Sequence, residues 1–96
     1  MQITKNSVAG TMESSDIMIT MEPGSNGIEI ELQSVVEKQY GQRIRAVIEE
    51  TLSELGVSAV KVTAVDKGSL DCTIRARVKT AVCRAGGGPV CNWSAA

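Results

Sequence analysis

An alternation of apolar and polar residues predicts strands in the first third of the chain. Apolar side chains occupy every second position in residues 17–21 and again in residues 28–33, which is the two-residue period of a half-buried strand. The Pro/Gly-rich residues 23–27 separate the two runs, so we expect them to pair as an antiparallel hairpin. A further edge strand is expected near residues 8–12.

The apolar period then changes to three and four residues, which predicts a long helix over residues 34–55. Ser34 and Glu37 have the spacing of a capping box at its start. Gly56 stands where a left-handed residue would end the helix. Residues 57–65 return to alternation and are expected to form a third strand.

Residues 70–85 fit two patterns, because their apolar side chains recur both at every second and at every fourth position. We expect a helix, since the four-residue pattern extends as far as Ala85 and Ala, Arg and Lys dominate the second half. Its solvent side would carry Arg75, Arg77, Lys79 and Arg84. Such a basic face is usually just solvated, but it could also dock an acidic partner surface.

These elements predict a single α+β domain: a small antiparallel sheet covered on one face by two helices, in the order β-β-α-β-α. We expect the domain to span residues 1–85. Gly86, Gly87, Gly88 and Pro89 should then begin a flexible tail over residues 86–96. The tail holds Trp93, which could pack back onto the domain or contact a partner.

Composition excludes several classes of function. Ten basic and eleven acidic residues among 96 give a net charge of −1, so nothing favours a nucleic-acid or anionic-membrane partner. Histidine, the commonest general base and a common zinc ligand, is absent from the chain. An autonomous hydrolase is therefore not expected.

The three cysteines, Cys72, Cys83 and Cys91, form an odd number without a CxxC pair. We expect no metal site and three free thiols, as in a reducing compartment. The first residues lack the apolar core of a signal peptide, and no apolar run approaches membrane-spanning length. A cytoplasmic protein is expected.

Residues 8–16, Val-Ala-Gly-Thr-Met-Glu-Ser-Ser-Asp, are small and polar and precede the first strong alternation. Gly10 and the polar cluster from Glu13 to Asp16 favour a turn, in which Ser14 and Ser15 would be exposed. On the residues alone, both serines are more often turn formers than a site.

Three stretches together resemble a known family. Residues 8–16, residues 34–41 (SVVEKQYG) and residues 66–77 (DKGSLDCTIRAR) look like the citrate lyase acyl carrier protein (gamma subunit) family, and the similarity runs from residue 1 to about residue 93. The resemblance implies a non-catalytic carrier whose serine, here Ser14 after Glu13, holds a covalent prosthetic group. That group would be 2'-(5''-phosphoribosyl)-3'-dephospho-coenzyme A, joined through a phosphodiester.

The resemblance also implies partners. A separate transferase would attach the group, an alpha subunit would exchange its acetyl for citrate, and a beta subunit would cleave the citryl thioester, so that citrate yields acetate and oxaloacetate. The carrier of malonate decarboxylase, or an unmodified α+β interaction module, are the alternatives. Glu13 and Asp16 either meet basic surfaces of these partners or shape the turn around Ser14.

Overall fold

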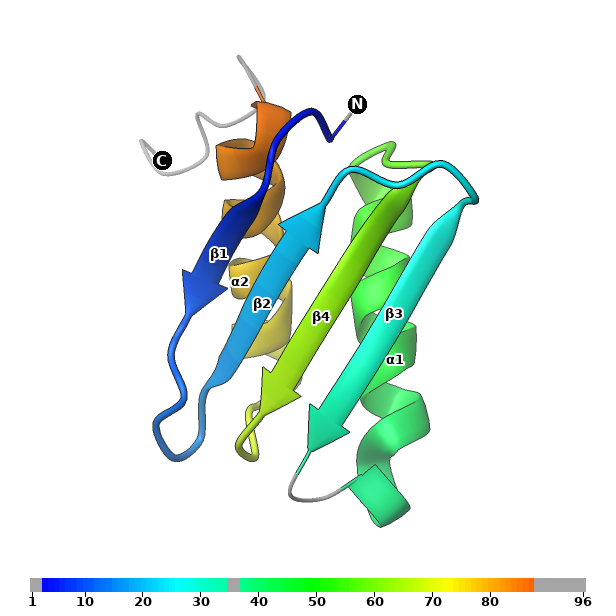
Figure 1. Ribbon diagram of the computed structural model, residues 1–96. Coiled ribbons are helices and arrows are strands. Elements are labelled where there is room, and N and C mark those ends of the chain that lie inside the picture. Colours follow the sequence, from blue (N-terminus) through cyan, green and yellow to red (C-terminus); the bar gives the residue numbers. More distant parts are fainter. Residues whose placement is uncertain (1–2, 35–36, 88–96) are drawn as a thin grey trace.

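The computed structural model describes residues 3–34 and 37–87 (Figure 1). The elements are β1 (Ser7–Gly10), β2 (Ile17–Glu22), β3 (Ile28–Ser34), α1 (Glu37–Glu54), β4 (Val60–Asp66), α2 (Asp71–Val82) and a π-helical turn, η1 (Cys83–Gly87). A four-stranded sheet forms one layer, and both helices cover the same face of it (Figure 1). The predicted α+β class and the two helices on one face are confirmed.

The pairing of the strands differs from the expected hairpin. The sheet order is β1-β2-β4-β3, so β4 lies between the two strands that were expected to pair. Ala64 of β4 is opposite Ile19 of β2 and Leu32 of β3. β3 and β4 are parallel because α1 crosses one face of the sheet and returns the chain in the same direction. The sheet is therefore mixed, and the prediction of an antiparallel hairpin is wrong.

The core fills the space between the sheet and the helices. β2 and β4 present alternate side chains to the helices, and α1 and α2 each present one apolar side. The fully buried large side chains include Ile17, Ile19, Met21, Val47, Ile48, Leu52, Val60, Val62, Ile74, Val78 and Val82. The chain contains no Phe, so in the described residues aliphatic side chains together with Met21 provide the apolar stabilisation.

The helix boundaries shift slightly from the expected ones. Ser34 is the last residue of β3, and its hydroxyl donates to Asp66 (2.9 Å). The described helix begins at Glu37, and residues 35–36 lie outside the described residues, so the capping box of Ser34 and Glu37 stays a prediction. α2 confirms the helical interpretation of residues 70–85, although it ends at Val82 and continues as η1.

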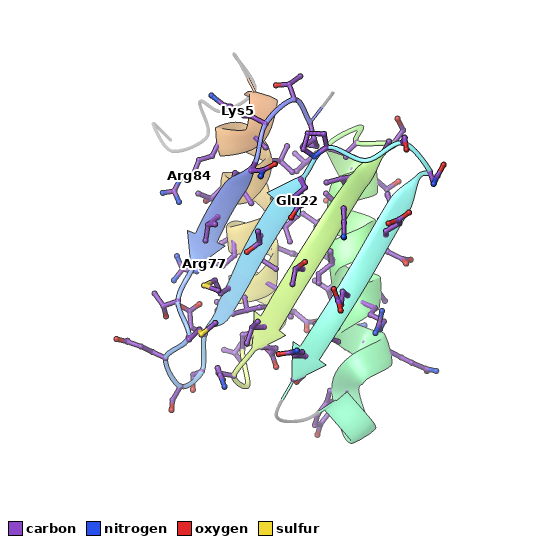
Figure 2. The ribbon with its side chains drawn as sticks, in the orientation of Figure 1. Lys5, Glu22, Arg77 and Arg84 are labelled. Atoms are coloured by element: carbon purple, nitrogen blue, oxygen red, sulfur yellow. The ribbon has the colours of Figure 1, made fainter. Side chains whose placement is uncertain are left out.

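The beginning of the chain is fastened to the end of the domain. The amides of Thr4 and Lys5 donate to the Ala85 carbonyl (3.0 and 3.1 Å), and the Ser7 hydroxyl donates to the Ala81 carbonyl (2.7 Å). Arg84 donates to the carbonyl of Val8 on β1 (2.7 Å). Figure 2 shows Arg84 and Arg77 beside the outer edge of β1, and a charged side chain there discourages pairing with another strand. Residues 88–96, including Trp93, lie outside the description, so the domain boundary at residue 85 stays a prediction.

Two of the three cysteines can be placed. Cys72 is exposed and free, as expected. Cys83 is disulfide-bonded, so the expectation of three free thiols is wrong. An odd number of cysteines excludes the pairing of all three but does not exclude one disulfide. Cys91 lies outside the description. Over residues 3–34 and 37–87, no helix combines the length and apolar character needed to cross a bilayer, and no Cys, Asp and Glu cluster could hold a metal ion.

Candidate functional site

The loop between β1 and β2, residues 11–16, contains Ser14 and is called the serine loop below. It lies at the lower end of the sheet in Figure 1, beside the loop that joins β4 to α2. Ser14 is exposed in a β-turn closed by the bond from the Asp16 amide to the Glu13 carbonyl (3.2 Å). Ser15, the third residue of this turn, has φ of 66°, a left-handed value as in a type II turn.

The serine loop is tied to the neighbouring β4–α2 loop through backbone bonds. The Ser15 amide donates to the Lys67 carbonyl (2.8 Å), and the Lys67 amide donates to the Asp16 carbonyl (2.9 Å). Two residues of one strand thus face one residue of the other, as in a β-bulge whose first residue is left-handed. That position usually belongs to Gly, so Ser15 carries backbone strain that the surrounding bonds must hold.

Asp16 is the centre of the side-chain bonds in the serine loop. Arg77 of α2 donates through Nε to Oδ1 (3.1 Å) and through Nη2 to Oδ2 (2.9 Å). The Thr11 hydroxyl donates to Oδ2 (2.6 Å) and the Ile17 amide to Oδ1 (2.7 Å). The hydrogen bonds from Arg77, then from Thr11, hold the pKa of Asp16 well below its ordinary value of 3.8. The carboxylate is therefore ionised and both of its oxygens are engaged.

Thr11 and Gly10 complete this arrangement. Thr11 Oγ1 also accepts a bond from the Glu13 amide (3.2 Å), so one hydroxyl links both sides of the turn. Gly10 has φ of 95°, and a Cβ there would lie 1.9 Å from the Ile17 carbonyl oxygen and 3.2 Å from Cδ of Arg77. Only glycine lets β1 enter the loop this closely.

The β4–α2 loop is organised around a second carboxylate. Asp66 is buried and accepts bonds from the hydroxyls of Ser34 and Ser69 and from the amides of Gly68 and Ser69. Burial acts to raise the pKa of Asp66, but the bonds from Ser69, Gly68 and Ser34 outweigh it and the pKa is lowered. Asp66 opens residues 66–77, one of the stretches that carry the family resemblance, and no local pattern in the sequence indicated its contact with Ser34.

Exposed apolar side chains gather at this end of the molecule. Met12 and Tyr40 are each 55 % exposed and Leu70 is 69 % exposed. A shallow hollow of about 390 Å³ is lined by Tyr40, Gly68, Ser69, Leu70 and Asp71. Exposed apolar groups near one site are typical of a surface that contacts another molecule.

The basic residues expected on the solvent side of α2 are mostly used within the domain. Arg75 pairs with Glu50 and Glu54, Arg77 with Asp16, and Arg84 with the Val8 carbonyl. Asp16 likewise shapes the loop, which is one of the two roles considered for it. Glu13 is exposed, and its contact with a basic partner surface stays a prediction.

The arrangement presents the Ser14 hydroxyl without activating it. A serine hydroxyl is a weak nucleophile at neutral pH and needs an adjacent base. The chain contains no His, and the two oxygens of the nearby Asp16 are occupied by Arg77, Thr11 and Ile17. The exposed turn leaves room for a bulky group at Ser14, and the bonds described here place no free base beside the hydroxyl.

The comparisons with known proteins find carrier subunits of citrate lyase and subunits of malonate decarboxylase. A protein-family model described as "Malonate decarboxylase delta subunit (MdcD)" matches residues 4–85. Citrate lyase acyl carrier proteins of Streptococcus uberis, Streptococcus mutans and Lacticaseibacillus casei are 61 %, 58 % and 54 % identical to this chain, and each alignment covers 97 % of this chain and 92 % of the relative. A chain in the crystal structure of a Pseudomonas malonate decarboxylase hetero-tetramer in complex with malonate has a TM-score of 0.75 at 21 % identity, over 90 % of this chain and 89 % of that one. That structure supports the fold alone.

Proposed function

This chain belongs to the family of citrate lyase acyl carrier proteins, and we propose that Ser14 is the residue that carries its covalent prosthetic group. The chain is a carrier subunit of citrate lyase rather than a catalytic one. The observation that supports Ser14 is its exposed position in a turn that backbone and side-chain bonds hold on both sides.

The proposed group is 2'-(5''-phosphoribosyl)-3'-dephospho-coenzyme A, attached through a phosphodiester. When bound, such a group supplies a thiol that holds acetyl or citryl as a thioester. The protein's own residues do less: Ser14 offers the oxygen of the ester bond, and the serine loop keeps that oxygen at the edge of the molecule. Because Cys72 lies on α2 and not in the serine loop, it has no part in this proposal.

The proposed partners follow from the membership of this chain in the citrate lyase carrier family. A transferase would attach the group to Ser14, and the alpha and beta subunits of citrate lyase would act on the acyl group. Met12, Leu70 and Tyr40 are the exposed apolar side chains nearest to this end and are suited to contact them. A cytoplasmic location remains a prediction.

The carrier of malonate decarboxylase is the second candidate, because the matching family model and the similar solved structure bear that name. The identities of 54 % to 61 % favour citrate lyase. Loading the modified protein into either set of catalytic subunits separates the two: we expect turnover of citrate with citrate lyase subunits and none of malonate with malonate decarboxylase subunits.

Co-expression with the transferase and intact-protein mass spectrometry tests the attachment site. We expect the added mass in the wild type and in Ser15→Gly, which keeps the left-handed backbone of residue 15, and no added mass in Ser14→Ala. Removing an exposed hydroxyl should change the unfolding free energy by less than about 0.5 kcal/mol.

Two outcomes contradict the proposal. Added mass on Ser14→Ala that disappears in Ser15→Gly would move the site to Ser15. A wild type that remains unmodified beside an active transferase would favour the unmodified interaction module.

A further inference from the structure

We infer that Arg77 is a positioning residue for the modification of Ser14: through Asp16 it fastens the serine loop to α2, so that the transferase meets the hydroxyl in one conformation. This inference rests on the proposed attachment of the prosthetic group to Ser14. Arg77 and Asp16 are 61 positions apart in sequence.

The internal bonds of the serine loop converge on Asp16. Its amide closes the turn on Glu13, and its carboxylate receives the Thr11 hydroxyl, which in turn accepts the Glu13 amide. A change in the orientation of this one carboxylate would therefore loosen both sides of the turn that holds Ser14.

Arg77 is the group from another element that sets this orientation. It donates from two nitrogens, one to each carboxylate oxygen, and such a planar fork fixes the direction of the carboxylate as well as its position. A lysine would supply the charge without the fork.

Arg77 is itself held in place. It projects from a helix whose neighbouring residues Ile74 and Val78 are fully buried against the sheet. Its Cδ would lie 3.2 Å from a Cβ at residue 10, closer than ordinary van der Waals contact, so the absence of a side chain at Gly10 leaves room for it. Figure 2 shows Arg77 beside the lower end of β1, next to the serine loop. The guanidinium thus holds the turn at a fixed position relative to α2.

The partial exposure of the Arg77–Asp16 ion pair indicates that it affects the position of the serine loop more than the stability of the whole domain. The Arg77 side chain is 39 % exposed and that of Asp16 is 13 % exposed. A pair open to water on one side adds little to the stability of the whole domain. A displacement of about 1 Å of a reacting group, however, can reduce a reaction rate by about a hundredfold. The main effect of losing Arg77 should therefore appear in the modification step.

The test uses full-length apo-protein with Arg77→Met, which retains much of the apolar stem and removes the fork. Arg75→Met is the matched control, because Arg75 lies on the same helix with a similar exposure of 32 % and pairs instead with Glu50 and Glu54 of α1. Two readouts are measured: kcat and KM of the transferase, and amide hydrogen exchange over residues 11–16.

For Arg77→Met we expect kcat/KM to fall about tenfold or more and the Ser15 amide to exchange faster than in the wild type. Arg75→Met should stay within about twofold of the wild type in kcat/KM, with unchanged exchange in the serine loop. Arg77→Lys should recover part of the rate, because it restores the charge alone.

A double-mutant cycle with Asp16→Asn decides whether Arg77 acts through Asp16. We expect the double variant to be no slower than the slower single variant, since both remove the same contact. Additive losses, with normal exchange in the serine loop of Arg77→Met, would mean that Arg77 touches the transferase directly and would overturn the inference. So would equal rates for Arg77→Met and Arg75→Met. A wild type that is not modified at Ser14 would instead refute the proposed function, and the exchange data would still test the contact.

Discussion

Two aspartates lie at the same end of the sheet on neighbouring strands, Asp16 just before β2 and Asp66 at the end of β4, and different kinds of group hold them. Asp16 precedes β2 and faces a cation from α2, whereas Asp66 ends β4 and accepts bonds from hydroxyl and amide groups. In the described part of the chain no ion pair involves Asp66. Asp66 is 1 % exposed, while the side chain of Asp16 is 13 % exposed.

At one end of a small domain, therefore, one set of bonds can maintain the stability of the fold while another sets the conformation in which Ser14 is exposed. A buried carboxylate with several donors is costly to disturb, because each donor would lose its partner away from water. A partly exposed ion pair costs less to remove but connects two elements that are distant in sequence. We therefore assign the integrity of the domain mainly to the Asp66 loop and the conformation of Ser14 mainly to the serine loop.

The largest change in stability is expected from two glycines near these aspartates, Gly10 before the serine loop and Gly68 in the β4–α2 loop. Gly10 and Gly68 both have left-handed φ values, 95° and 89°, but only at Gly10 would a Cβ meet other atoms within 4 Å. Gly10→Ala should therefore destabilise the protein by about 2 to 5 kcal/mol, from backbone strain and overpacking together. Gly68→Ala should lose only the strain, about 1 to 2 kcal/mol. Urea unfolding of both variants gives the comparison, and equal losses would contradict it.

A smaller effect is expected from the aspartates themselves. Asp66→Asn should lower the unfolding free energy by about 2 kcal/mol, because the amide nitrogen would face donors that need an acceptor. Asp16→Asn should lower it by about 1 kcal/mol, since Arg77 is partly solvated. Modification of Ser14 should follow the reverse order, with the greater loss in Asp16→Asn. Thermal unfolding and transferase kinetics on the same two proteins measure both orders.

The smallest effect is the dependence of stability on acid. Both carboxyls have folded-state pKa values below the ordinary 3.8, so their contribution is fully present well above that value and is lost as the pH falls through it toward the folded-state values. We expect the contribution of these two groups to the unfolding free energy to stay constant from about pH 8 to pH 5. Below that range the slope should be at most about 1.4 kcal/mol per pH unit for each group.

Substitution separates the two contributions to this acid dependence. The decline should be weaker in Asp16→Asn and in Asp66→Asn than in the wild type, because each variant lacks one of the titrating groups. Urea unfolding from pH 3 to pH 8 would show this, and a slope that neither substitution changes would mean that other carboxyls control the acid stability.

The sequence predicts which segments form helices and strands better than it predicts which strands pair with each other. Alternation in β2 and β4 and the four-residue period in α1 reflect burial of one face, which each segment shows by itself. Whether β3 pairs with β2 or with β4 depends on where α1 crosses the sheet, and no local period records that. The Pro/Gly-rich residues 23–27 suggested a hairpin, although they connect strands separated by β4.

The candidate site shows the same limit. The turn around Ser14 follows from its small and polar residues, and the choice of Ser14 over Ser15 came from the family resemblance. The contacts that tie the turn to the rest of the domain come from Arg77 and Lys67, which lie more than fifty positions away. A basic residue on an amphipathic helix looks solvated in sequence, so Arg77 could not be distinguished from Arg75 without the structure.

The link between Asp16 and Arg77 also imposes an order on synthesis. The ribosome makes Ser14 early, but the turn acquires its fastening to α2 only after 77 of the 96 residues exist. The Ser7 contact with Ala81 adds the same requirement for β1. A nascent chain therefore contains Ser14 well before the serine loop can take its folded conformation, and under the proposed function an attaching enzyme that recognises this conformation would act only after Arg77 has been made.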